Sequence, residues 1–208
     1  MISRRSQIAI CAALVAGVAV SAFAIEYDER RLDARLDGEF LHVMAPNFSF
    51  LSGKSLERLK DGASVAFIAQ LTVSTSPNYV VPDAQPSVAR FAVSYDIWDE
   101  RFSVTKIGDR SDQKRAMSHL TGPAAETWCF DKLTLHRSDL PTDRPFYIQL
   151  DMRVEDPRDM AGMIGDGGIS LARMIQVFSR PVRDKQAHWL LNSGQVRLED
   201  LLRKGMHG

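Results

Sequence analysis

The sequence predicts a mainly β, antiparallel β-sandwich-like domain with two helical insertions and an N-terminal signal helix. Two observations lead to this fold class. Apolar residues occupy every second position in several separate segments, most clearly in residues 146–154. Most of these segments are joined by short turns rather than by regular helical crossovers, which favours antiparallel pairing. An open antiparallel sheet with helices on one face is the alternative arrangement.

Residues 1–24 have the layout of a cleavable export signal. Arg4 and Arg5 precede an uncharged run over residues 8–23, and Ala22-Phe23-Ala24 fits the small-residue cleavage pattern. The run is shorter than the roughly 18 residues of a membrane span and is rich in Ala and Gly, so a retained anchor is the minor alternative. We expect cleavage after Ala24 and a periplasmic or secreted product, which would meet a membrane only through an uncleaved signal.

The remaining residues, 25–208, are expected to form a single β-rich domain. Cleavage removes Cys11 and leaves only Cys129, so no intrachain disulfide can form and the fold must depend on burial. Cleavage also removes Arg4 and Arg5 from a chain with 26 basic and 26 acidic residues, which leaves a small acidic excess. Without a basic patch, nucleic acid is not an expected partner.

The sequence predicts strands and one short helix in the N-terminal half of the domain. Asp37-Gly38, between an alternating segment and the apolar run 40–44, predicts a tight hairpin with both central residues at positive φ. Residues 55–60 are typical of a helix that Gly62 ends. Residues 65–73 are apolar on both faces, which indicates a covered central strand. A loop with three prolines follows, over residues 76–87.

The middle of the chain combines a hairpin with the helical insertions. The alternation in residues 89–97 and the apolar residues at 102 and 104 predict a hairpin with its turn at Asp96 to Glu100. Ser111 can cap a helix running to about Leu120, and a second helix is expected from Pro123 to Trp128. Leu133 and Leu135 indicate a short strand.

The C-terminal part begins with the cleanest strand pattern, residues 146–154, expected to have one face in the core and the other in water. Residues 157–208 form an extension in which the glycine-rich stretch Gly162 to Gly168 leads into a helix within 169–180, ended by Pro181. We expect this helix to pack on or beside the sheet. A strand at 189–191, a turn at 192–194 and an amphipathic turn at 198–202 complete the chain.

Three segments together resemble a known family. They are Leu59-Lys60-Asp61-Gly62 followed by Val65-Ala66-Phe67, the hairpin 90–105 with Tyr95-Asp96, and residues 140–156 with Tyr147 and Asp151. Their order resembles that of the exported bacterial family catalogued as domain of unknown function 4390, over about residues 32–156. The glycine-rich insertion after Pro157 departs from that pattern. The resemblance implies a secreted or periplasmic β-rich domain without established chemistry, and it transfers no catalytic residue.

No set of residues predicts a catalytic, cofactor or metal site. Trp128 and Phe130 flank Cys129, which indicates a buried, inert thiol, and its only local candidate base is His119. The histidines lack the i, i+4 spacing of a helical metal site; they are His42, His119, His136, His188 and His207.

Other candidate motifs have simpler interpretations. His136-Arg137-Ser138-Asp139 lacks the rest of a kinase signature and is interpreted as a polar turn. Asp96, Asp99 and Glu100 lack calcium-loop spacing and are interpreted as solvated turn residues. Gly162 to Gly168 precedes a helix and could surround an anion, but it lacks the P-loop Lys, so a hinge or surface loop is favoured.

These observations favour a non-enzymatic exported module that binds an envelope protein or another envelope component. Its expected partner or ligand surface is the apolar helix face made by Leu171, Met174, Ile175 and Phe178. The alternative is a carrier of a small apolar ligand, held in a cleft between the sheet and that helix. An extracytoplasmic hydrolase is the third hypothesis, and it requires His119, His136, His188 and the acidic turn to converge in one pocket. The sequence leaves the oligomeric state open.

Overall fold

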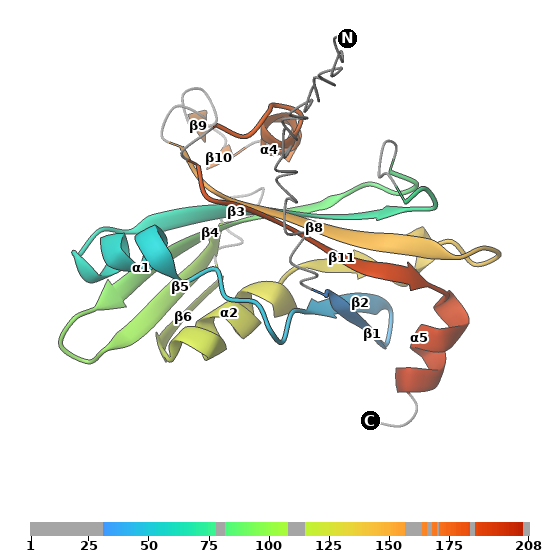
Figure 1. Cartoon of the computed structure of the whole chain (residues 1–208), viewed down its shortest axis with the longest axis horizontal. Helices are drawn as coiled ribbons and strands as arrows, with labels where there is room; N and C mark the ends of the chain where they lie inside the picture. Colours follow the sequence, from blue (N-terminus) through green and yellow to red (C-terminus); the bar gives the residue numbers. More distant parts are fainter. Residues whose placement is uncertain are drawn as a thin grey trace, which may run out of the picture.

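The main feature of the fold is a curved, six-stranded antiparallel sheet in the order β11-β8-β3-β4-β5-β6 (Figure 1). The computed structural model describes residues 31–77, 82–107, 115–156, 164–165, 168–169, 171–183 and 186–205. The sheet's strands are β3 (Val65–Ser74), β4 (Ser87–Asp96), β5 (Arg101–Ile107), β6 (Arg115–Leu120), β8 (Phe146–Val154) and β11 (His188–Val196). The predicted antiparallel β-rich fold is confirmed.

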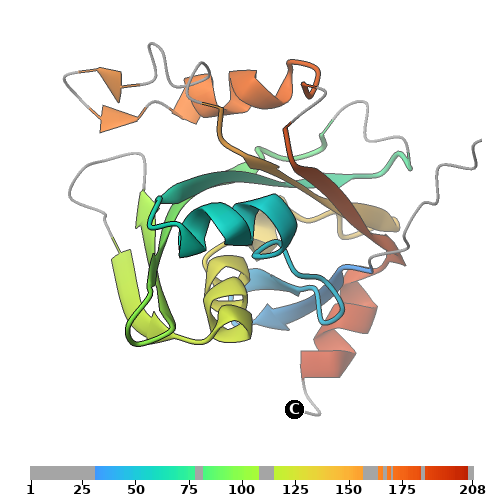
Figure 2. The same ribbon diagram turned by 60° about the vertical axis from the view of Figure 1, so that its left-hand side comes forward.

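A smaller antiparallel sheet, in the order β1-β2-β7, lies on one side of the large sheet. It consists of β1 (Asp33–Asp37), β2 (Phe40–Met44) and β7 (Thr134–His136). Helices α1 (Gly53–Lys60) and α2 (Gly122–Asp131) lie on the same side, where the large sheet curls around them (Figure 2). Helix α5 (Leu198–Gly205) packs against β1.

The opposite side of the large sheet carries α4 (Leu171–Phe178) and the two-residue strands β9 (Ile164–Gly165) and β10 (Gly168–Ile169) (Figure 2). The predicted helix within residues 169–180 is therefore present. Among the described residues, no helix is long and apolar enough to span a membrane.

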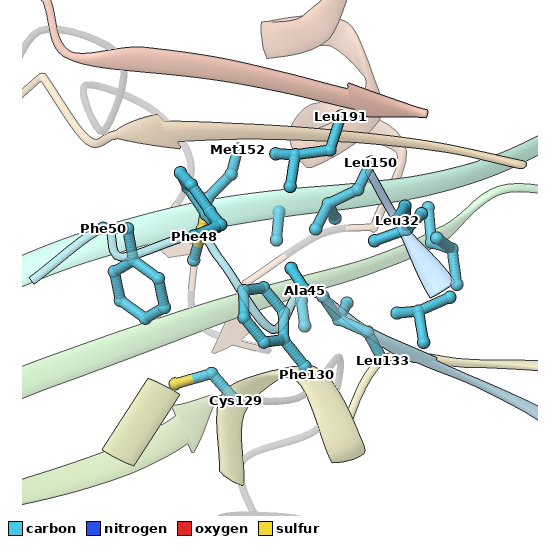
Figure 3. Packing of buried hydrophobic residues seen from close by; sticks show 14 of the residues in the cluster. Leu32, Ala45, Phe48, Phe50, Cys129, Phe130, Leu133, Leu150, Met152 and Leu191 are labelled. Carbon is cyan, nitrogen blue, oxygen red and sulfur yellow. The ribbon is translucent and has the colours of Figure 1, made fainter. Parts of the chain in front are cut away.

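The main core lies between the large sheet and the elements on its curled side. Alternate residues of β3 and β8 point into it, including Phe67 and Leu71 from β3 and Leu150 from β8. Aromatic rings from the loop after β2 fill the centre, where the rings of Phe50 and Phe67 meet edge to face with centroids 4.8 Å apart. Figure 3 shows Phe48, Phe50 and Phe130 gathered with Leu and Met side chains in this core.

A second, small cluster explains why β3 is apolar on both faces. Ile68 points away from the main core and packs with Val177 of α4. The prediction of a covered central strand is confirmed. The prediction for β8 needs a correction, because its outer face does not simply meet water. Arg153 on that face is only 6% exposed, since α4 lies over it.

The turn of the first hairpin lies one residue later in the chain than predicted. Asp37 pairs with Phe40, so Gly38 and Glu39 form the two-residue loop. Gly38 has φ +56 and Glu39 has no positive φ, which is the pattern of a turn with Gly at its first central position. Both central residues were predicted at positive φ, but this turn type requires a positive φ only at the first of them.

Local hydrogen bonds explain where α1 ends and where α2 begins. In α1, the amide of Gly62 donates to the carbonyl of Leu59 and that of Ala63 to the carbonyl of Arg58, a Schellman arrangement with Gly62 at φ +82. In α2, the Thr121 side chain accepts a hydrogen bond from the amide of Ala124 at the N-terminus. The second predicted insertion is confirmed and is longer than expected.

The first predicted helical insertion, Ser111 to Leu120, is wrong for the residues that the structure describes. Residues 115–120 form β6, which pairs with β5, while 111–114 lie outside the described residues. Pairing with β5 gives hydrogen-bond partners to one row of backbone N–H and C=O groups in β6. This tertiary contact outweighs the weak helical preference of residues 115–120. The strand has a register shift opposite Phe102 and Val104, and His119 takes φ +60.

The predicted turn at Asn192-Ser193-Gly194 is instead an irregularity inside β11. The strand runs from His188 to Val196, and its register against β8 shifts between Asn192 and Gln195. Gly194 adopts φ +67, and the Ser193 hydroxyl accepts a hydrogen bond from the amide of Ile148 at 3.0 Å. A bulge accommodates the turn-forming residues without ending the strand.

Several predictions fall on residues outside the described ranges. They concern the signal helix and cleavage site within residues 1–30, most of the stretch Gly162 to Gly168, and His207. The final amphipathic segment is confirmed as α5, which places Leu198 and Leu201 in the core.

Candidate binding cleft

A cleft of about 760 Å³ opens beside the main core, between β2 with its following loop, α1, α2 and the end of the β4–β5 hairpin. It is the size of a small-molecule or side-chain binding site. Its lining residues are Arg35, His42, Val43, Met44, Ala45, Pro46, Asn47, Phe48, Ser49, Leu51, Leu56, Lys60, Tyr95, Glu100, Phe102, Gly122, Pro123, Glu126, Thr127, Phe130 and Asp131.

The floor of the cleft is apolar because it is the edge of the core itself. Val43, Phe48, Leu51 and Phe130 line the cleft and are also buried core residues. After β2 the chain reverses at Pro46 and Asn47, where the amide of Phe48 donates to the carbonyl of Ala45 at 3.2 Å. This turn brings the aromatic ring of Phe48 back over α2, 6.2 Å from the ring of Phe130.

Glu126 is the most buried charged residue that lines the cleft, at 7% exposed. Its Oε1 accepts hydrogen bonds from the Ser49 hydroxyl and from the Leu51 amide, both at 2.7 Å. A carboxylate can remain buried when charge-assisted hydrogen bonds replace its water. Glu126 therefore ties the loop after β2 to α2 and fixes one wall of the cleft.

A second polar group lies where β2 meets the end of α2. His42 Nδ1 lies 3.2 Å from Asp131 Oδ1, and Lys132 Nζ lies 2.9 Å from Asp131 Oδ2. The hydrogen bond from Lys132 lowers the pKa of Asp131, burial opposes this shift, and the charges of Lys132, His42 and Arg35 lower the pKa further. The carboxylate stays charged at neutral pH and lies beside His42 at one end of the cleft, while Lys132 contacts it from outside the cleft lining.

The predicted partner surface lies on the other side of the large sheet from this cleft. On α4, Val177 is buried against Ile68, while Ile175 and Phe178 are half-buried. The Arg153 guanidinium lies 4.9 Å from the centre of the Phe178 ring. The side chains of Leu171 and Met174 lie outside the described residues. Part of the Phe178 side chain is therefore already covered by the protein's own sheet.

A buried polar cluster holds the end of α4 to that sheet. Arg153 donates two hydrogen bonds to Asp151, through Nε at 3.0 Å and Nη2 at 2.8 Å. It also donates to the carbonyls of Val177 at 3.3 Å and Arg180 at 3.0 Å. A cation at a helix C-terminus complements the helix dipole and the unpaired carbonyls there. His188 Nε2 completes the cluster, 3.0 Å from Asp151 Oδ1.

The structure does not bring the three predicted histidines together. His136 is exposed, with Nδ1 2.7 Å from the Ser138 hydroxyl; His119 lies on β6; and His188 belongs to the Arg153 cluster. None of them lines the cleft, although Glu100 of the acidic turn does. Across the described ranges, no group of three His, Cys, Asp or Glu residues could hold a metal ion.

Cys129 lies on the buried face of α2, fully inaccessible to solvent. Burial raises the pKa of its thiol well above the usual range, and the nearby Glu126 charge raises it further. The thiol is therefore protonated and unreactive in the folded chain, as its aromatic neighbours indicate.

Sequence reasoning missed the cleft because its residues come from five separate segments. One local signal was present: Glu126 is a lone acid among apolar and uncharged residues in 122–130, and such an acid on a buried helix face requires polar partners. No family model, curated protein or solved structure matches this chain.

Proposed function

We propose that this chain is an exported, non-enzymatic binding module of the cell envelope, and that the cleft between α1, α2 and the loop after β2 is its binding site. The observation that carries the proposal is an apolar floor bordered by a few fixed polar groups. Binding sites typically combine those two features, the floor for affinity and the polar groups for orientation.

The occupant that fits best is an apolar side chain or short segment of an envelope protein. The floor is formed by rigid core side chains, so little conformational entropy is lost when a partner binds. The surrounding charges, including Arg35, Lys60 and Glu100, can pair with polar groups beside the inserted side chain.

The second candidate is a carrier of a small apolar ligand. It is favoured by the cleft volume of about 760 Å³, which lies within the range of small-molecule sites. The ligand would then lie beside α1 and α2, rather than between the large sheet and α4 as the sequence suggested. A hydrolase is the weakest candidate, because the cleft does not contain His119, His136 or His188.

Three further parts of the proposal rest on the sequence. Residues 1–24 support export and cleavage after Ala24. The resemblance to domain of unknown function 4390 agrees with an exported β-rich domain. A sandwich-like scaffold, in which the small sheet faces the large one across the core, is supported by Leu41 and Leu135 sharing one cluster with Leu71 and Leu150.

Site-specific photo-crosslinking in envelope extracts tests the binding site. A photoreactive residue at Thr127, which lines the cleft, should crosslink to a partner that the same residue at Glu57 does not reach, because Glu57 lies on α1 outside the cleft. Thr127→Trp should fill the cleft and abolish the crosslink from a probe at Asn47, whereas Glu57→Trp should not. Equal crosslinking in all variants would contradict the proposal, and native mass spectrometry would reveal a small ligand instead.

Export is tested by the mass and thiol count of protein recovered from fractionated cells. A product beginning at Ile25 has one cysteine, Cys129, and should bind one equivalent of thiol reagent after denaturation. A retained signal adds Cys11 and a second equivalent. A two-thiol product in the cytosolic fraction would overturn the proposed location.

A further inference from the structure

The turn of the β4–β5 hairpin presents two apolar side chains to solvent. Trp98 is 94% exposed and Ile97 is 57% exposed. The turn extends beyond the body of the large sheet, at the left in Figure 1. Aromatic side chains are usually buried or at interfaces, so an almost fully exposed Trp needs a separate explanation.

The turn is held in one conformation by its own residues. The Asp96 carboxylate accepts hydrogen bonds from the amides of Trp98 at 2.9 Å and Asp99 at 3.1 Å. Glu100 completes the reversal with φ +53. Trp98 is therefore presented on a fixed support, and little backbone entropy would be lost on binding.

The charges around Trp98 indicate what kind of surface it meets. Asp96, Asp99 and Glu100 surround it with carboxylates, and Arg101 is the one cation in residues 96–101. This acidic turn is repelled by anionic lipid and is complementary to an apolar site with cations at its edge.

The cleft of the same chain has that combination. Its apolar floor is bordered by Arg35 and Lys60, both exposed, and in the described part of the chain neither has an ion-pair partner within 4.0 Å, although the Arg35 charge acts on Asp131. Three carboxylates line the cleft as well: Glu126 accepts hydrogen bonds from Ser49 and Leu51, Asp131 lies beside Lys132 and His42, and Glu100 lies at the hairpin end. Tyr95, Glu100 and Phe102 of the hairpin line the cleft, so the hairpin turn and the cleft are neighbours on one face. A patch that contains both a projection and its complement can pair with a second copy around a two-fold axis.

We propose that the chain forms a two-fold homodimer in which Trp98 of each copy inserts into the cleft of the other, with the acidic turn beside Arg35 and Lys60. This inference rests on the proposed function, because it names an occupant for the same cleft. An envelope partner and the second copy then compete for one site.

Sedimentation velocity of the full mature chain across a concentration series tests the inference. The wild-type chain should dimerise, and Trp98→Ala should weaken dimerisation at least about tenfold, as expected for a central aromatic anchor. At a protein concentration low enough for both chains to be monomeric, the unfolding midpoint of this variant should equal that of the wild type, because Trp98 is 94% exposed in one copy. Leu190→Ala, at an exposed apolar residue on the opposite edge strand, is the matched control and should dimerise normally.

Charge reversal tests the orientation of the pair. Lys60→Glu and Asp99→Lys should each weaken the dimer, and the double variant should recover part of the loss. Raising the salt concentration to 1 M, where the Debye length falls to about 3 Å, should weaken the wild-type dimer. A double variant no better than the single ones would contradict the assigned contact.

Other outcomes overturn the inference in distinguishable ways. A chain that stays monomeric up to about 1 mM has no such dimer. A dimer unaffected by Trp98→Ala and Thr127→Trp uses another surface. Trp98-dependent binding of a monomer to phosphatidylcholine vesicles would assign the turn to a membrane surface. If the chain is monomeric yet a probe at Thr127 still crosslinks to an envelope component, the dimer fails and the proposed function stands.

Discussion

Arg153 and Asp151, two residues apart on β8, form a bidentate ion pair beneath α4, with Nε–Oδ1 and Nη2–Oδ2 distances of 3.0 and 2.8 Å. Their side chains share one face of the strand because they are two positions apart. The same guanidinium also donates hydrogen bonds to three carbonyls at the end of α4, those of Val177, Phe178 and Arg180. One side chain therefore links the large sheet to the C-terminal extension.

Replacing this arginine should both destabilise the domain and release α4. Arg153→Met leaves the Asp151 charge buried without its main partner, which typically costs about 3–5 kcal/mol. We expect a lower denaturation midpoint and lost amide-exchange protection at the end of α4. Arg144→Met is the control, because its ion pair with Asp83 is long, at 3.7 Å, and its side chain is 59% exposed. That change should cost less than about 1 kcal/mol. Equal effects of the two changes would contradict the assigned role.

The acid sensitivity of the domain should depend on Asp151. Burial raises the pKa of this carboxyl, but hydrogen bonds from His188 and Arg153 and their charges outweigh burial, so the folded pKa lies below the ordinary value. The contribution to stability is therefore complete above the unfolded pKa of about 3.9 and is lost as pH falls through the lower folded pKa.

Denaturant midpoints measured from about pH 7 to pH 2 check this expectation. In the wild type, the free energy of unfolding should fall below about pH 4; Asp151→Asn should be less stable at neutral pH and should fall less steeply. Asp83 and Asp131 also have lowered pKa values, so part of the slope should remain. An unchanged slope in Asp151→Asn would show that this carboxyl is not linked to folding.

Glu126 should support both stability and the shape of the cleft. Glu126→Ala leaves the buried amide of Leu51 without its acceptor, which costs about 1–3 kcal/mol. The loop after β2 should then exchange its amide protons faster. Ser49→Ala removes only the hydroxyl donor to Glu126 and should cost about 0.5–1.5 kcal/mol. Loop exchange as slow in Glu126→Ala as in the wild type would contradict this role.

The bulge in β11 should depend on one hydroxyl. Ser193 accepts from the amide of Ile148, a fully buried residue of β8, where the register shift interrupts the ladder. Ser193→Ala should cost about 1–3 kcal/mol in chemical denaturation, because a buried N–H loses its partner. Ser94→Ala, on an exposed position of β4, should stay within about 0.5 kcal/mol of the wild type. Similar costs at both positions would show that the hydroxyl is not needed.

Strand periodicity made most of the large sheet predictable. The patterns in residues 65–73 and 146–154 identified β3 and β8, because a period of two requires one face to be buried. The strand β6 was missed because Arg115 to Leu120 is an exposed edge whose sequence lacks an apolar face, and pairing with β5 decides its structure.

The cleft could not be predicted by the same reasoning. Glu126, Ser49 and Leu51 meet across more than seventy residues, and no local pattern encodes that contact. The Arg153 cluster was missed for a related reason. Arg153 alternates with the core residue Met152, so the sequence places it on a face of β8 that meets water, and only the position of α4 shows that this face is covered.

The free outer edge of β6 has a practical consequence for anyone who purifies this protein. Among the described residues no strand lies beside that edge, and the strand has only Arg115 and its register shift against β5 to discourage pairing. Concentrated stocks should therefore accumulate fibrillar aggregates during storage, through edge-to-edge growth. Replacing Met117 by Lys would guard the edge and lengthen the useful life of a sample.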